Sequence, residues 1–183
     1  MTRQQIHAQF AAEFHRGSRP ECVPSAALDW LEQELGMMLP ESYRLFLLRQ
    51  GLLITPVLAD MVAESREWEL PPVLEFFPPS TALAATRSAW MSGLPRTLIV
   101  IAKGADQTLF CFERGRKAKR RTDDAAVWVF NPLAGVPQRT SDSFDAWLQE
   151  YVEAVYAKEE YGEDMDEVAC REAGKELRKR TKP

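Results

Sequence analysis

Residues 144–156 of the chain read Phe-Asp-Ala-Trp-Leu-Gln-Glu-Tyr-Val-Glu-Ala-Val-Tyr, and this stretch decides the fold. Its apolar residues recur at helical positions i, i+3, i+4, i+7, i+8, i+11 and i+12, namely Phe144, Trp147, Leu148, Tyr151, Val152, Val155 and Tyr156. One face of the helix is therefore continuously apolar and has to be buried against another layer of structure. We predict that Trp147 is buried in that contact.

Upstream of this helix, the hydrophobic pattern changes from helical to extended. Residues 97–101, 108–113 and 127–130 are β-branched or aromatic runs separated by turn residues, which predicts an antiparallel meander. Residues 52–55 suggest a further short strand, and residues 73–77 can form at most a short edge strand, because the proline pairs beside them cannot donate to a ladder. We expect the closing helix to pack on the sheet face that holds Ile99, Ile101, Phe110 and Phe112.

The first part of the chain is predicted to be helical. Apolar residues recur at every fourth position near the N-terminus, at Ile6, Phe10 and Phe14. Ser25 is the expected N-cap of a second helix and Gly36 its stop. Together with helices predicted over residues 26–35, 40–51 and 80–91, the pattern indicates an α+β fold. In that fold, an antiparallel sheet of about four to six strands is packed by N-terminal and C-terminal helices.

Length and composition indicate one soluble globular domain. The chain has 183 residues, of which 45% are hydrophobic and 27% charged. We predict a single domain over residues 1–158, followed by a charged tail over residues 159–183 that is either helical or disordered. Neither a secretion signal nor an apolar run of membrane-spanning length occurs. The three cysteines are far apart and form no CxxC motif, so a reducing, cytoplasmic location is expected.

The sequence carries little that could support catalysis. It lacks the common motifs for phosphate, dinucleotide, zinc and acyl-transfer chemistry. Its two histidines, His7 and His15, are eight positions apart and are expected to be solvated or packed rather than to act as ligands or bases. We therefore predict no catalytic residues, no metal site and no cofactor, and hence a protein that is not an enzyme.

An acidic stretch offers one candidate binding surface. Asp60, Glu64 and Glu67 lie close together in the sequence and surround Trp68. A tryptophan within a polar ring is typical of an interface anchor. The alternative is that Trp68 belongs to the core while the acids face water, since tryptophan is highly buried on average.

A basic loop offers the second candidate surface. Residues 114–121 carry six positive charges and no negative charge, five of them on Arg116, Lys117, Lys119, Arg120 and Arg121. A solvated hairpin tip that buries nothing and is dispensable for folding is the alternative to a binding loop. We do not expect nucleic acid to be the ligand, because the loop has no aromatic residue to stack on bases and the rest of the chain is acidic.

The order of these segments resembles the SUKH superfamily, which includes the Smi/Knr yeast cell-wall regulators and many bacterial immunity proteins. Residues 28–36 look like the family's first helix, ending in Leu-Gly, and residues 37–47 like its Leu-Pro step and second helix. Residues 97–112 resemble the central hairpin, and residues 143–148 the closing Ser-Phe helix. The similarity covers about residues 25–155.

This resemblance implies an α+β protein that works by binding other proteins. For bacterial members, it implies a cytoplasmic immunity protein that neutralises a contact-delivered toxin by direct binding. The acidic body would favour a basic toxin domain, such as a nuclease. The alternative is a regulatory or scaffolding protein that binds an endogenous partner, as the yeast relatives suggest.

Overall fold

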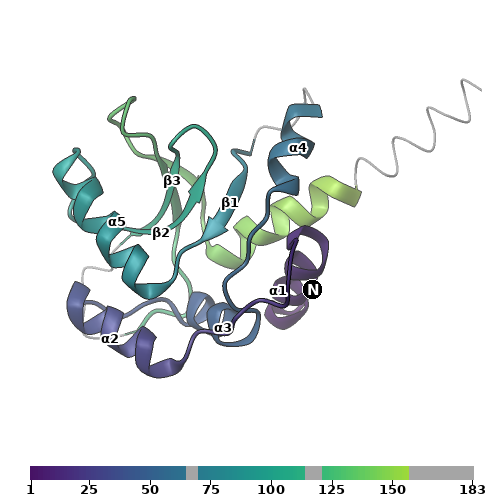
Figure 1. The fold of residues 1–183 in the computed structure, drawn as a ribbon, viewed down its shortest axis with the longest axis horizontal. Helices are drawn as coiled ribbons and strands as arrows, with labels where there is room; N and C mark the ends of the chain where they lie inside the picture. The colour runs from purple at the N-terminus through teal and green to yellow at the C-terminus, as the bar shows by residue number, and fades with distance from the viewer. Residues whose placement is uncertain (65–69, 114–120, 157–183) are drawn as a thin grey trace, which may run out of the picture.

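A five-stranded antiparallel sheet, in the order β1-β2-β3-β4-β5, organises the fold (Figure 1). The computed structural model describes residues 1–64, 70–113 and 121–156. The strands are β1 (Val73–Phe76), β2 (Leu98–Gly104), β3 (Leu109–Glu113), β4 (Val127–Phe130) and β5 (Gln138–Ser141). The helices are α1 (Arg3–Phe14), α2 (Ser25–Leu35), α3 (Glu41–Arg49), α4 (Val57–Glu64), α5 (Pro79–Met91) and a closing helix described over residues 144–156. The predicted α+β fold with an antiparallel sheet is confirmed.

The closing helix packs its apolar face on the sheet, as its periodicity predicts. Trp147 has no exposed surface, and its ring lies 4.8 Å from that of Phe110 on β3. The Phe144 ring lies 5.6 Å from that of Phe112 on the same strand. These edge and tilted ring contacts are the arrangements that aromatic quadrupoles favour. The closing helix is thereby fixed against the centre of the sheet.

Helices α1 and α3 complete the same core, while α5 covers another part of the sheet. Phe10 of α1 contacts the ring of Tyr151 on the closing helix, and Phe46 of α3 contacts that of Phe144. Helix α5 packs against β2, and α2 packs against α5 (Figure 1). The N-terminal helix is therefore integral to the core.

The sequence pattern did not predict two elements, strand β5 and helix α4. Strand β5 consists of Gln138, Arg139, Thr140 and Ser141 and lies at the sheet edge, where Gln138 and Arg139 are exposed. Helix α4 follows Pro56, and from Asp60 onward it overlaps the acidic stretch noted in the sequence. The predicted strand over residues 52–55 is reduced to one bridge, between Ile54 and Glu75.

The start of α2 also differs from the prediction. Pro24 occupies the N-cap and Ser25 is the first helical residue, so the prediction of Ser25 as the cap is wrong. The Ser25 hydroxyl instead accepts a hydrogen bond from Arg44 at 2.9 Å. Gly36 does end the helix, in the left-handed conformation with φ of 63° that favours glycine. The predicted tail, residues 159–183, lies outside the described residues.

Candidate functional site

The N-terminus of the closing helix is held by side-chain caps. Ser143 Oγ accepts a hydrogen bond from the backbone N–H of Ala146 at 3.0 Å. The Asp124 carboxylate accepts from the N–H groups of Phe144 at 2.9 Å and Asp145 at 3.2 Å. A carboxylate at this position also complements the positive end of the helix dipole. These caps fix the place of Asp145 in the first turn.

Asp145 is the centre of a polar cluster between the closing helix, α1 and α3. Its carboxylate accepts hydrogen bonds from Arg3 Nε at 2.6 Å, from His7 Nε2 at 2.8 Å and from the Ser42 hydroxyl. Burial by itself would raise the pKa of Asp145, but the hydrogen bonds from its three donors outweigh burial and lower the pKa below its ordinary value. Asp145 is therefore a stable anion. Arg3 also bonds Asp123, with Nη2 to Oδ2 at 2.7 Å.

The grouping of serine, histidine and aspartate in this cluster does not have the geometry of a catalytic triad. In a triad, the serine and the aspartate bond to opposite nitrogens of the imidazole. Here Ser42 Oγ and Asp145 Oδ1 both contact His7 Nε2, at 3.4 and 2.8 Å. The Ser42 side chain has no exposed surface, so no substrate can reach its hydroxyl. The cluster therefore holds three helices together and does not form a nucleophile.

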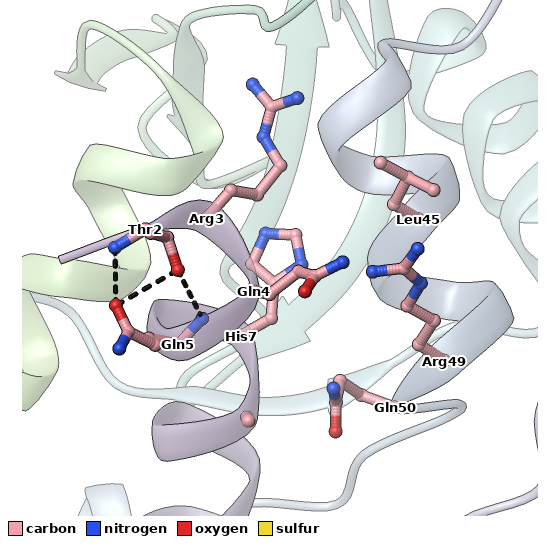
Figure 2. A pocket seen from close by; sticks show the side chains of 9 residues that line it. Thr2, Arg3, Gln4, Gln5, His7, Leu45, Arg49 and Gln50 are labelled. Atoms are coloured by element: carbon pink, nitrogen blue, oxygen red, sulfur yellow. Dashed lines mark hydrogen bonds between the residues drawn. The ribbon is translucent and has the colours of Figure 1, made fainter.

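A cleft lies in front of this cluster, between the N-terminal half of α1 and the outer side of α3 (Figure 2). Its volume is about 780 Å³, and it is lined by Thr2, Arg3, Gln4, Gln5, His7, Ala8, Leu45, Arg49 and Gln50. A capping box orders the α1 end of the wall, because Thr2 Oγ1 accepts from the Gln5 N–H while Gln5 Oε1 accepts from the Thr2 N–H. The cleft is thus walled by two helices that are anchored in the core.

A second polar network connects α2 and α3 with residue 121. Glu32, which is 8% exposed, accepts hydrogen bonds from the Leu39 N–H at 2.9 Å and from Arg121 Nη1 at 2.5 Å. Arg121 also donates to the Leu39 carbonyl at 2.9 Å. Arg44, in turn, forms an ion pair with Asp29 at 2.8 Å. The expectation that the basic loop buries nothing is therefore wrong for Arg121, which contacts the buried Glu32.

The other predicted contact residues are only partly described. Asp60 lies exposed on α4 and forms no ion pair with any residue of the described segments. Glu64 is the last residue of α4. Glu67 and Trp68 lie outside the described residues, as do four residues of the basic loop, Arg116, Lys117, Lys119 and Arg120. The two surfaces predicted from charge patterning therefore stay predictions.

The histidines and cysteines of the described segments form no metal-binding group. Within residues 1–64, 70–113 and 121–156, no three His, Cys, Asp or Glu side chains are placed to hold a metal ion. His15 lies at the end of α1, where its Nδ1 accepts from the Ile54 N–H at 3.2 Å. Cys111 is fully buried in β3, and burial raises the pKa of its thiol. Both ring nitrogens of His15 lie within hydrogen-bond distance of backbone groups, and the Cys111 thiol is closed to solvent.

Comparison with known families identifies the fold just described. The model of the SMI1 / KNR4 family (SUKH-1) matches residues 23–150. The chain belongs to the SMI1 / KNR4 family. The match runs from the segment before α2 into the closing helix, and it includes the whole sheet and Asp145. No curated protein matches the chain at a significant level.

Membership of the SMI1 / KNR4 family supports an immunity or regulatory module, since such domains generally act by binding proteins. Helix α1 precedes the matched segment, so Arg3 and His7 come from outside it while Ser42 and Asp145 come from within. The sequence pattern missed this cluster because its members are far apart along the chain. The only local signal was the Ser-Phe-Asp order at the start of the closing helix.

No helix of the described segments is both long and apolar enough to cross a membrane.

Proposed function

We propose that the chain is a non-catalytic protein-binding module that acts in the cytoplasm as an immunity protein. It would cover a toxin delivered by a neighbouring cell and so prevent the toxin from acting. Family membership supports binding as the activity. The Asp145 cluster supports binding over catalysis. Its serine, Ser42, is buried and donates its hydroxyl proton to Asp145, so it is not placed to attack a substrate.

The charge of the chain favours a basic partner, such as a nuclease domain. The net charge is −4, although residues 114–121 contribute six positive charges, so the rest of the chain is strongly acidic. Complementary charge increases the rate of encounter between proteins and selects against partners of like charge. We place the contact at Asp60, Glu64, Glu67 and Trp68. Asp60 contributes an exposed carboxylate there that no described cation neutralises.

Co-expression tests the immunity proposal. Each neighbouring gene whose product is toxic alone is expressed with and without this chain, and growth is measured. Rescue of growth by one such pair, with formation of a complex between the purified proteins, is the expected result. If no neighbouring gene has a toxic product, or if this chain restores growth with none of them, the immunity proposal is abandoned. The alternative, a regulatory protein that binds an endogenous partner, then takes its place.

Charge reversal tests the contact surface once a toxin is identified. Replacing Asp60, Glu64 and Glu67 by Lys should slow association by about tenfold or more at low ionic strength and weaken its salt dependence. The matched control reverses three exposed acids elsewhere, Glu21, Glu113 and Glu153. Both variants should keep a native circular dichroism spectrum. Equal slowing in both variants would show that net charge acts without a contact at α4.

A further inference from the structure

We propose that one end of the sheet docks on the basic toxin and inserts two apolar side chains into a pocket of that protein. This sheet-end surface consists of the turn between β2 and β3, residues 105–108, and the loop between β4 and β5, residues 131–137. It adds an apolar anchor to the contact at α4. The inference rests on the proposed function, because it takes the toxin as the partner.

The sheet topology brings both connections to the end of the sheet where α4 begins. Neighbouring strands are consecutive along the chain, so the connections after β2 and after β4 lie at the same end. The registers agree, since Val73 lies opposite Gly104 and Leu109 opposite Phe130. The Thr55 hydroxyl donates to the Val73 carbonyl at 2.7 Å, just before α4 starts (Figure 1). From β1 to β4 is about 15 Å, so one interface of about 800 Å² per partner can cover all three segments.

The loop between β4 and β5 exposes two aliphatic side chains three positions apart. Leu133 is 81% exposed and Val136 is 67% exposed. The other exposed large apolar side chains of the described segments lie singly on different elements, which is usual for a soluble protein. Residues 125–138 contain no charged residue, although 27% of the chain is charged. The tip of this loop can therefore enter an apolar pocket without taking a charge out of water.

Asn131 holds the loop in one conformation. Its side-chain Oδ1 accepts a hydrogen bond from the Leu133 N–H at 2.9 Å, and its carbonyl accepts from the N–H groups of Ala134 and Gly135, both at 3.0 Å. Gly135 has a φ of 75°, in the left-handed region that favours glycine. These three N–H groups need no partner from the toxin, and an ordered loop loses little conformational entropy when it docks.

The turn between β2 and β3 places a carboxylate beside this loop. Asn131 Nδ2 donates to the Asp106 carbonyl at 3.4 Å, which joins the two connections. Asp106 is exposed and forms no ion pair within the part of the chain that the structure describes. Both Asp106 and Gln107 have positive φ, 51° and 62°, and glutamine rarely adopts this conformation. Backbone strain of this kind is typical of functional sites.

The charges at this end of the sheet favour a basic partner. Two cations flank the connections, and each is paired within the chain, Lys103 with Glu75 at 2.6 Å and Arg139 with Asp142 at 2.8 Å. The Asp106 carboxylate is left without a counter-ion. A basic protein with an apolar pocket complements both the carboxylate and the aliphatic pair. An anionic lipid surface would instead be repelled by an acidic chain.

The affinity of the full chain for the purified toxin identified by co-expression tests the proposal. The variant L133S/V136S should weaken binding by about a hundredfold, because two aliphatic side chains lose their burial in the complex. The matched control M38S/M91S removes two apolar side chains that are 39% and 88% exposed outside this surface, and it should weaken binding by less than about threefold. Both variants should keep the native urea midpoint, because the removed side chains are exposed in the free chain.

A second pair of variants tests the carboxylate. D106K should slow association with the toxin by about tenfold at low ionic strength. E153K makes the same charge change at an exposed residue of the closing helix and should slow it by less than about threefold. Equal slowing by the two variants would overturn the role of Asp106.

Two results would refute the sheet-end surface while leaving toxin neutralisation intact. One is rescue of growth and unchanged affinity with L133S/V136S. The other is binding of the native chain to vesicles of phosphatidylcholine and phosphatidylserine that L133S/V136S abolishes, which would assign the loop to a lipid surface. If the native chain neutralises no toxin, the proposed function fails, and this inference fails with it.

Discussion

Removing the Trp147 indole should cost a large part of the stability of the domain. Trp147 has no exposed surface, and its ring contacts four others, with ring centroids 4.8–6.1 Å away: Phe76, Phe110, Phe144 and Tyr151. Replacing a buried Trp by Ala costs about 3–5 kcal/mol, and each aromatic pair adds about 0.5–1.5 kcal/mol beyond its buried area. We therefore expect W147A to lie at the upper end, about 4–5 kcal/mol.

Urea unfolding followed by far-ultraviolet circular dichroism measures this loss. The urea concentration at the unfolding midpoint should fall. The slope of the free energy of unfolding against urea concentration should stay constant, since the surface exposed on unfolding changes little. W30A is the matched control, because Trp30 is 41% exposed, and it should lose less than about 1 kcal/mol. If W147A has no folded baseline, W147F reports on the same site with a smaller loss.

The reasoning is refuted if W147A loses less than about 1.5 kcal/mol, or no more than W30A. Either result would mean that packing of the closing helix on the sheet does not depend on the Trp147 ring. The expected loss is large, because the free energy of unfolding of an ordinary domain is only about 5–15 kcal/mol.

Two further predictions concern the polar clusters. The pKa of Asp145 lies below its ordinary value, so its stabilising contribution is present above about pH 4, the range of an unfolded Asp, and is lost as the pH falls further. D145N should therefore be less stable than the native chain at neutral pH, with the gap narrowing below about pH 4. A gap that is independent of pH in urea unfolding would contradict the role of the ionised carboxylate. R121S should lower the free energy of unfolding by about 1–3 kcal/mol, because Glu32 stays buried and loses its shortest ion pair. Replacement of Arg116, Lys117, Lys119 and Arg120 by Ser should change it by less than about 0.5 kcal/mol, and equal effects of the two variants would overturn this distinction.

The layers of the fold could be predicted because hydrophobic periodicity is local. The closing helix presents its apolar residues without a miss, and the runs at β2, β3 and β4 have the β-branched and aromatic composition of buried strands. Strand β5 could not be found in this way, because an edge strand with polar residues has the composition of a loop. Helix α4 was hidden for a related reason, since its acids lie in a longer acidic stretch.

The polar groups were predicted less well, because their roles depend on contacts across the chain. Arg121 ends a run of like charges that is typical of a solvated loop, yet its guanidinium donates a hydrogen bond to Glu32, 89 positions away in the sequence. The sequence predicts only a solvated or packed side chain for His7, yet His7 forms a hydrogen bond with Asp145, which lies 138 positions further along the chain. The acidic and basic surfaces predicted from charge runs stay predictions, since most of their residues lie outside the described segments.

The sequence by itself therefore determined most of the helices and strands, which of their faces are apolar and which family the chain resembles. Only the tertiary structure decided that Asp145 joins α1, α3 and the closing helix, and that a cleft lies between α1 and α3. The physical reason is the range of the interactions. Burial of an apolar face follows from a repeat within one segment, whereas a hydrogen bond between distant side chains exists only once packing has placed both partners within about 3 Å.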